Sequence, residues 1–163
     1  MERFTISLDQ ELAQEFERLI ADRGYQNRSE AVRDLLRSRL EALRFERNEA
    51  RHCVANLSFV YNHHERTLAE RLAGLQHDNH DLIVSAMHVH LDHENCIESL
   101  ILRGLTTSVR GFANSLIAEP GVRHGQMNLV SLHSDAHPHT HAHQSAGAGA
   151  GRAQRHTHLK PKS

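Results

Sequence analysis

The chain has 163 residues, a formal net charge of −1 and two cysteines. This length fits one domain or two small ones, and two cysteines exclude the disulfide framework of a small secreted protein. The sequence contains neither a signal peptide nor an apolar stretch long enough to span a membrane. We therefore expect a cytoplasmic protein without a membrane partner.

The first segment, residues 3–8, alternates strictly between polar and apolar side chains. In a strand, alternation places the two sets on opposite faces. The apolar set is Phe4, Ile6 and Leu8, and the polar set is Arg3, Thr5 and Ser7. The pattern predicts a short strand that is buried on one face only.

Two helices are expected after this strand. The first begins behind Asp9, whose carboxylate can cap its first turn, and ends at Gly24. The second begins where Asn27 and Glu30 have the spacing of a capping box, and it continues to about residue 43. One strand and two helices cannot bury a core alone, so we expect the strands and helices of two chains to pair.

Such a paired ribbon would fit the major groove of DNA, where arginine reads guanine and hydroxyl groups read several base edges. The free N–H groups at the start of the second helix can bind a backbone phosphate. The residues expected to contact DNA are Arg3, Thr5, Ser7, Asn27, Arg28 and Ser29. From the pattern alone, a solvated polar strand face remains the alternative.

Residues 3–44 resemble a ribbon-helix-helix DNA-binding domain. The stretch from Gly24 to Ala31, Gly-Tyr-Gln-Asn-Arg-Ser-Glu-Ala, matches the signature between its two helices. The resemblance implies a dimeric βαα domain, which we place at residues 1–48, and it favours DNA binding over a merely solvated strand.

A second domain is predicted at residues 53–133, after a linker at 49–52. Its pattern indicates strands and helices in the order βαββαβ, at residues 53–61, 65–76, 82–91, 96–103, 107–118 and 126–132. This order is typical of a ferredoxin-like or ACT-like α+β fold, with an antiparallel sheet and both helices on one face. The bare sheet face must be covered, and self-association is the simplest cover.

The second and third of these strands carry a candidate metal site. His88 and His90 share one strand face. If the hairpin loop is His93 to Asn95, Asp92 lies opposite Cys96, and Cys96 joins that face. Imidazole and thiolate together suit nickel, copper, zinc or cobalt. The alternative is that His88 and His90 are simply two surface histidines. If the three residues do bind a metal, its fourth ligand position is left open to water or to a residue of another subunit.

The span from residue 3 to about 132 resembles the nickel-responsive transcriptional regulators. The shared motifs are Arg-Gly-Tyr-x-Asn-Arg-Ser-Glu-Ala, Gln76-His77, His80-Asp81-Leu82, His88-Val89-His90-x-x-His93-x-x-Cys96 and Gly121-Val122-Arg123-His124-Gly125. The resemblance implies a homotetramer, built as a dimer of dimers, with one Ni²⁺ per subunit in a square-planar site. The implied ligands are His88, His90 and Cys96 of one subunit and His77 of a neighbour.

Further roles follow from the same resemblance. Tyr61 and Glu98 are candidates for orienting a metal ligand. Glu30 and Asp34 lie one helical turn apart, and in the family such acidic residues can hold a second cation in the DNA-bound state. A neutralised surface pair is the alternative, because like charges at this spacing repel each other.

Residues 134–163 form a tail in which histidines alternate with small residues and Ala-Gly repeats follow. This composition predicts disorder. The histidines could bind divalent metals weakly as a store, or the tail could simply add solubility.

Together these features predict a nickel-dependent DNA-binding repressor, in which nickel orders the tetramer so that two ribbons bind a palindromic operator. Repression of nickel uptake is implied by the resemblance. The alternative is a histidine-rich metal storage or delivery protein, which needs no base-reading strand. A metal hydrolase is disfavoured because no acid–base pair accompanies the site, so we expect neither enzymatic activity nor a small-molecule substrate.

Overall fold

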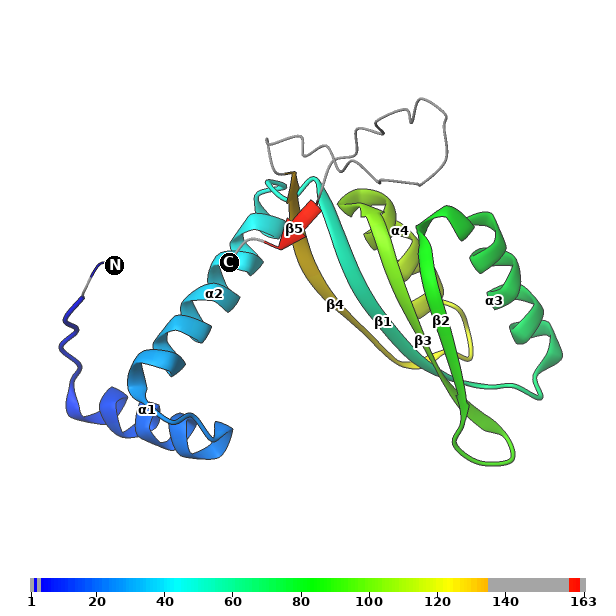
Figure 1. Cartoon of the computed structure of the whole chain (residues 1–163). Coiled ribbons are helices and arrows are strands. Elements are labelled where there is room, and N and C mark those ends of the chain that lie inside the picture. The colour runs from blue at the N-terminus through cyan, green and yellow to red at the C-terminus, as the bar shows by residue number, and fades with distance from the viewer. Residues whose placement is uncertain (1, 3, 135–158, 162–163) are drawn as a thin grey trace, which may run out of the picture. The chain divides into compact units, whose positions relative to one another are not determined.

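A computed structural model describes residues 2, 4–134 and 159–161 of the chain (Figure 1). The chain divides into two compact units, Met1–Leu43 and Arg44–Ser163. The second unit begins inside a helix, at a point earlier than the expected domain end at residue 48. The reason is that the Phe45 side chain is buried in the core of the second unit.

Two helices make up the described part of the first unit, α1 (Gln10–Arg23) and α2, which begins in it and spans Arg28–Glu46. Both expected caps are present. The Asp9 Oδ1 accepts a hydrogen bond of 2.9 Å from the Leu12 N–H, and the Asn27 Oδ1 accepts one of 2.9 Å from the Glu30 N–H. Gly24 ends α1 in the left-handed conformation, with φ of 68°.

The strand expected at residues 3–8 is not formed in the single chain. Arg3 lies outside the described residues, and residues 4–9 have no assigned secondary structure. A strand needs a neighbour to accept and donate its hydrogen bonds, and the described part of this unit contains no second strand. The apolar side chains of this segment are accordingly open to solvent, with 80% of Phe4 and 61% of Ile6 exposed.

The second unit is an antiparallel sheet with two helices. Its elements are β1 (His52–Asn62), α3 (Arg66–Asp78), a short 3₁₀ helix (His80–Leu82), β2 (Ile83–His90), β3 (Asn95–Leu105), α4 (Thr106–Ile117), β4 (Arg123–Ser134) and β5 (Leu159–Pro161). The strands lie in the order β2-β3-β1-β4-β5. The first six major elements follow the expected βαββαβ order, so the α+β, ferredoxin-like prediction is confirmed.

The last strand corrects the expectation that residues 134–163 are disordered throughout. Ser134 is the final residue of β4, and β5 pairs with the end of that strand, where His133 lies opposite Lys160. An edge strand presents unpaired N–H and C=O groups, and a returning segment can satisfy them. Residues 135–158 lie outside the described part of the chain.

The two faces of the sheet differ in character. Alternate residues of β1, from Cys53 to Tyr61, are buried with Leu68 and Leu72 of α3 and Leu116 of α4, which places both helices on this face (Figure 1). On the opposite, bare face, apolar side chains remain exposed: Met87, Val89 and Val130. Among the described residues, no helix is long and apolar enough to cross a bilayer.

Candidate functional site

The hairpin of β2 and β3 brings three predicted metal ligands to one face. His88 lies opposite Glu98, and His90 lies opposite Cys96. Directly opposite residues share a face, so both imidazoles and the thiol are on the helix-covered side. The predicted pairing of Asp92 with Cys96 is wrong by two residues. The shift preserves the face because side chains alternate with a period of two.

The cause of the shift is the Asp92 side chain. Its Oδ1 accepts hydrogen bonds from the backbone N–H groups of Glu94 (2.8 Å) and Asn95 (2.7 Å). These bonds hold Asp92 inside the turn instead of at the end of β2. Aspartate commonly closes turns in this way, by bonding to the backbone two or three residues ahead.

The chemistry of these three side chains suits a borderline-soft metal ion such as Ni²⁺. The ring centroids of His88 and His90 are 5.0 Å apart. Cys96 is fully buried, and burial raises the pKa of its thiol, so the metal would have to displace the proton. β2 is the edge strand of the sheet, which leaves this side open to a further ligand.

The fourth predicted ligand, His77, does not join the other three within one chain. It lies in the last turn of α3, with its ring centroid 6.1 Å from that of His80. Among the described residues, no group of three or more histidine, cysteine, aspartate or glutamate side chains is arranged to hold a metal ion. Within one chain, the described positions of His88, His90 and Cys96 therefore do not by themselves form a metal-binding group.

Glu98 connects the two predicted orienting residues with His88. Its Oε2 accepts a hydrogen bond of 3.1 Å from the Tyr61 hydroxyl and lies 3.9 Å from His88 Nδ1. Burial and then the neighbouring Glu98 charge raise the pKa of Tyr61, which keeps the phenol protonated as a donor. The Gln76 amide donates a bond of 2.7 Å to Glu98 Oε1.

The sequence predicts no role for Gln76, although it is the residue before His77. Its partner is 22 positions away, and no local spacing reports such a contact. The sequence likewise predicts no metal-related role for His63. Its ring centroid lies 4.7 Å from that of His90 and 4.5 Å from that of His64. Partial burial and these neighbouring imidazoles lower the pKa of His63.

The predicted DNA contacts are exposed wherever the structure describes them. Thr5 and Ser7 lie in the segment before α1. Asn27 precedes α2 and caps it, and Arg28 and Ser29 are the first residues of that helix. The Arg28 Nε donates to Glu17 Oε1 at 2.5 Å, and both side chains are largely open to solvent. An exposed pair of this kind contributes little and can be exchanged for a phosphate.

The acidic pair on α2 is half-buried. Glu30 and Asp34 are one turn apart, and Asp34 Oδ1 accepts a hydrogen bond of 3.4 Å from the Arg37 guanidinium. Two carboxylates at this spacing are too few to define a cation site, because Ca²⁺ and Mg²⁺ use about six or more oxygen ligands.

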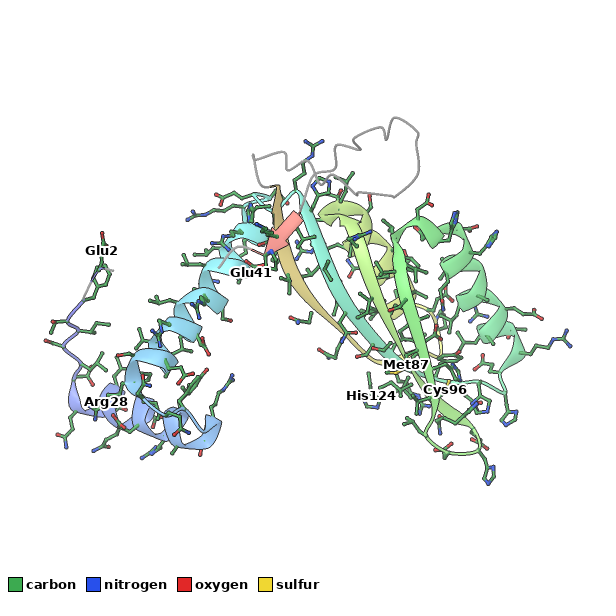
Figure 2. The ribbon with its side chains drawn as sticks, in the orientation of Figure 1. Glu2, Arg28, Glu41, Met87, Cys96 and His124 are labelled. Atoms are coloured by element: carbon green, nitrogen blue, oxygen red, sulfur yellow. The ribbon has the colours of Figure 1, made fainter. Side chains whose placement is uncertain are left out.

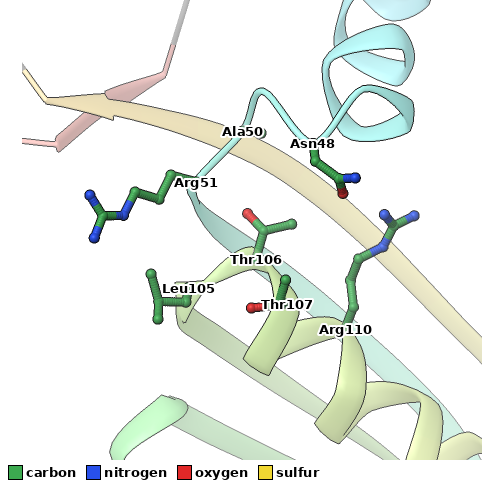
Figure 3. A pocket seen from close by; sticks show the side chains of 7 residues that line it. All are labelled: Asn48, Ala50, Arg51, Leu105, Thr106, Thr107 and Arg110. Carbon is green, nitrogen blue, oxygen red and sulfur yellow. The ribbon is translucent and has the colours of Figure 1, made fainter.

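A separate pocket of about 440 Å³ lies at the start of α4. It is lined by Asn48, Ala50, Arg51, Leu105, Thr106, Thr107 and Arg110 (Figure 3). The Arg110 side chain extends toward Asn48, whereas Arg51 points away from the pocket, so their guanidinium groups do not converge. The pocket contains none of the predicted site residues.

Comparison with known proteins identifies both units. Residues 54–130 match a family model described as the NikR C terminal nickel binding domain. Residues 2–43 match the model described as ribbon-helix-helix protein, copG family. The ribbon-helix-helix model ends at the boundary between the two compact units, and the nickel-binding model includes the β2–β3 hairpin.

Curated relatives match about four-fifths of the chain. A protein from Geobacter metallireducens is 46% identical over 135 residues, covering 83% of this chain and 96% of the relative. One from Nitratidesulfovibrio vulgaris is 46% identical over 133 residues, covering 82% and 95%. One from Solibacter usitatus is 44% identical over 131 residues, covering 80% and 94%. All three are named as nickel-responsive regulators.

Proposed function

The chain belongs to the family of nickel-responsive regulators, and on this premise we propose that it represses nickel uptake by binding operator DNA when Ni²⁺ is bound. Membership of a family of DNA-binding regulators also bears out the expectation that the chain is not an enzyme. Because operator DNA and reduced thiols are both cytoplasmic, the proposal places the protein in the cytoplasm.

The observation that carries the proposal is the register of the β2–β3 hairpin. It places His90 opposite Cys96 and His88 beside Glu98, on the open edge of the sheet. We propose that His88, His90 and Cys96 bind one Ni²⁺ per subunit, and that His77 of a neighbouring subunit supplies the fourth ligand. Four ligands of this kind allow a planar site, which nickel accepts and zinc resists.

Around this centre, Glu98 would fix the orientation of His88. A carboxylate that receives the second ring N–H of a metal-bound histidine sets its tautomer and raises its basicity. Tyr61 and Gln76 hold Glu98 by two hydrogen bonds, so the carboxylate is already placed without a metal.

The proposal links metal to DNA through assembly. A ligand from a second subunit would make nickel binding and subunit arrangement interdependent, in a homotetramer built as a dimer of dimers. The exposed apolar residues of the bare sheet face support self-association there, and those of residues 4–8 support pairing of two chains into a ribbon. Two ribbons at a fixed separation would bind the two halves of a palindromic operator together.

In the DNA-bound state, the polar residues of the ribbon, Arg3, Thr5 and Ser7, would read base edges. Asn27, Arg28 and Ser29 at the start of α2 would contact the phosphate backbone. Glu30 and Asp34 are proposed to hold a second cation in that state, with the remaining ligands coming from outside the pair.

The test is an operator-fragment binding titration against free nickel. Wild-type protein is expected to bind DNA more tightly with nickel, by roughly 5- to 150-fold for a typical coupling. His90→Ala should lose this dependence. His93→Ala is the matched control, because its ring lies in the same hairpin turn but is not a proposed ligand. Nickel-independent DNA binding by the wild type, with nickel still bound to His90→Ala, would overturn the sensor and favour storage by the histidine-rich tail.

A further inference from the structure

The turn between β2 and β3 carries one proposed ligand on each side, His90 before it and Cys96 after it. Its four residues, 91–94, therefore set how these two side chains face each other. The turn is closed by its own backbone: the N–H groups of Leu91 and Asp92 donate to the Asn95 carbonyl at 2.9 and 3.3 Å. The Asp92 carboxylate closes it further from inside.

Asn95 is the point where this turn is tied to the rest of the sheet. Its amide Nδ2 donates to both carboxylate oxygens of Asp92, at 3.1 and 2.9 Å. Its Oδ1 accepts a hydrogen bond from the Arg123 guanidinium. Arg123 is the first residue of β4, which is separated from β3 by the whole of β1. One arginine thus reaches across a strand to hold the turn.

A bulge at the start of β4 makes this reach possible. Ser58 of β1 lies opposite Gln126, but Val60 lies opposite Arg123, so β4 contains one extra residue here. His124, within the bulge, has φ of 52°, an uncommon conformation for a residue with a side chain. Figure 2 shows His124 at the same end of the sheet as Cys96.

Without the extra residue, Arg123 would lie opposite Tyr61 and point toward the helix-covered face. With it, Arg123 shares the bare face with Val60 and Asn62, and Asn95 lies opposite Asn62. Bulges commonly re-aim a side chain next to a functional site. The bulge therefore places the guanidinium on the same side of the sheet as its partner, behind the proposed metal ligands.

The two residues that follow β1 contact the turn as well. The His63 N–H donates to the Glu94 carbonyl at 2.9 Å, and His64 Nε2 is 2.7 Å from the His93 carbonyl oxygen. The turn is thus held both by the residues after β1 and, through Asn95, by Arg123. Neither set of contacts is needed to form the turn itself, so both serve to attach the turn to the rest of the sheet.

We propose that Arg123, acting through Asn95, is a positioning residue for the metal centre: it holds the β2–β3 turn so that His90 and Cys96 stay opposite each other. This inference rests on the proposed function, because it assumes that these two residues bind nickel. Removing the guanidinium would free the Asn95 side chain, loosen the Asp92 contacts and let the hairpin change register or widen.

The experiment compares Arg123→Gln with Arg123→Lys, and with Arg66→Gln as the matched control. Arg66 makes an exposed ion pair with Glu70 at 3.0 Å, and this ion pair does not involve the β2–β3 turn. In metal-free protein, Arg123→Gln is expected to speed amide exchange at Leu91, Asp92 and Asn95. In a chelator competition it is expected to weaken nickel binding at least about tenfold, as other outer contacts of metal ligands do. The nickel–thiolate absorption band should shift or broaden.

Arg123→Lys, which keeps the charge and one donor, is expected to recover part of the nickel affinity and the absorption band. A merely structural arginine would lower the unfolding temperature without changing the band of the metal-loaded protein. Unchanged exchange and unchanged nickel affinity in Arg123→Gln would overturn the positioning role. If His90→Ala also leaves nickel affinity unchanged, the proposed function itself fails; if His90→Ala abolishes nickel binding, only the role of Arg123 fails.

Discussion

At the scale of single residues, the proposed metal centre is surrounded by hydrogen-bonded groups that are not proposed as ligands themselves. Glu98 is almost fully buried, yet both its oxygens have donors, from Tyr61 and Gln76. A buried carboxylate is costly unless it is hydrogen-bonded in this way. Glu98 Oε2 also lies near the His88 ring. The fold of the chain therefore sets where this imidazole lies relative to the carboxylate.

The first prediction concerns this carboxylate. Glu98→Gln is expected to weaken nickel binding by about 10- to 100-fold, because the amide is a poorer acceptor for His88 and presents an N–H to existing donors. Chelator competition measures the affinity, with Glu94→Gln in the exposed turn as the control. Equal nickel affinities for the two variants would show that Glu98 does not act on the metal centre.

The second prediction concerns Cys53, the other cysteine. It is fully buried in the core, and burial raises the pKa of its thiol, an effect that the Thr106 hydroxyl and Arg110 only partly offset. A raised pKa leaves less thiolate at neutral pH, and the thiolate is the reactive form. We expect negligible alkylation of Cys53 by iodoacetamide at pH 7.5 in folded protein and full alkylation in denaturant, read by mass spectrometry. Rapid modification in the folded state would contradict the buried position.

At the scale of elements, the turn before β4 requires a glycine, whereas helix α3 contains one that it does not require. Gly121, which precedes β4, has φ of 98°, a conformation that side chains rarely adopt. A Cβ at this position would lie 2.7 Å from Leu68 Cδ2 in the core. Gly74 lies within α3, and a Cβ there would meet no atom within 4 Å.

Alanine substitutions at these two glycines are expected to change the free energy of unfolding in opposite directions. Gly121→Ala should lower the free energy of unfolding by more than about 1 kcal/mol, through backbone strain and the contact with Leu68. Gly74→Ala should raise it by about 0.5–1 kcal/mol, because alanine is the better helix former. Urea unfolding followed by circular dichroism gives both values. A neutral Gly121→Ala would mean that the turn before β4 can relax.

At the scale of the whole molecule, each unit has apolar surface that a monomer leaves uncovered. Residues 4–8 present Phe4, Ile6 and Leu8 to solvent, and the bare sheet face presents Val130. Clusters of exposed apolar residues mark interaction surfaces. In the proposed tetramer, the first would join two chains through a ribbon, and the second would join chains through their sheets.

Substitutions in these two surfaces are therefore expected to disrupt different steps of assembly. Ile6→Asp should disrupt ribbon pairing and abolish operator binding, while nickel-dependent association through the sheets persists. Val130→Asp should instead leave DNA-competent dimers that do not form tetramers with nickel. Sedimentation velocity with and without nickel separates these states. Tetramers of unchanged stability in both variants would refute this assignment of the interfaces.

The sequence by itself determined the order of elements, the caps at Asp9 and Asn27, and the face shared by His88, His90 and Cys96. These are local properties: hydrophobic period, cap spacing and strand alternation act over a few residues. The same locality explains why Tyr61 and Glu98 could be singled out as partners only through family resemblance.

Only the tertiary structure decided the features that depend on distant segments. In the β2–β3 ladder Cys96 lies opposite His90 and not opposite Asp92, because hydrogen bonds to the Asp92 side chain keep that residue in the turn and make the loop longer than the three residues expected. The tertiary structure brought Gln76 to Glu98 and Arg123 to Asn95, contacts made by helix packing and by a bulge. It also left residues 4–9 without a strand, because strand pairing is a property of two segments and the described part of this unit supplies only one.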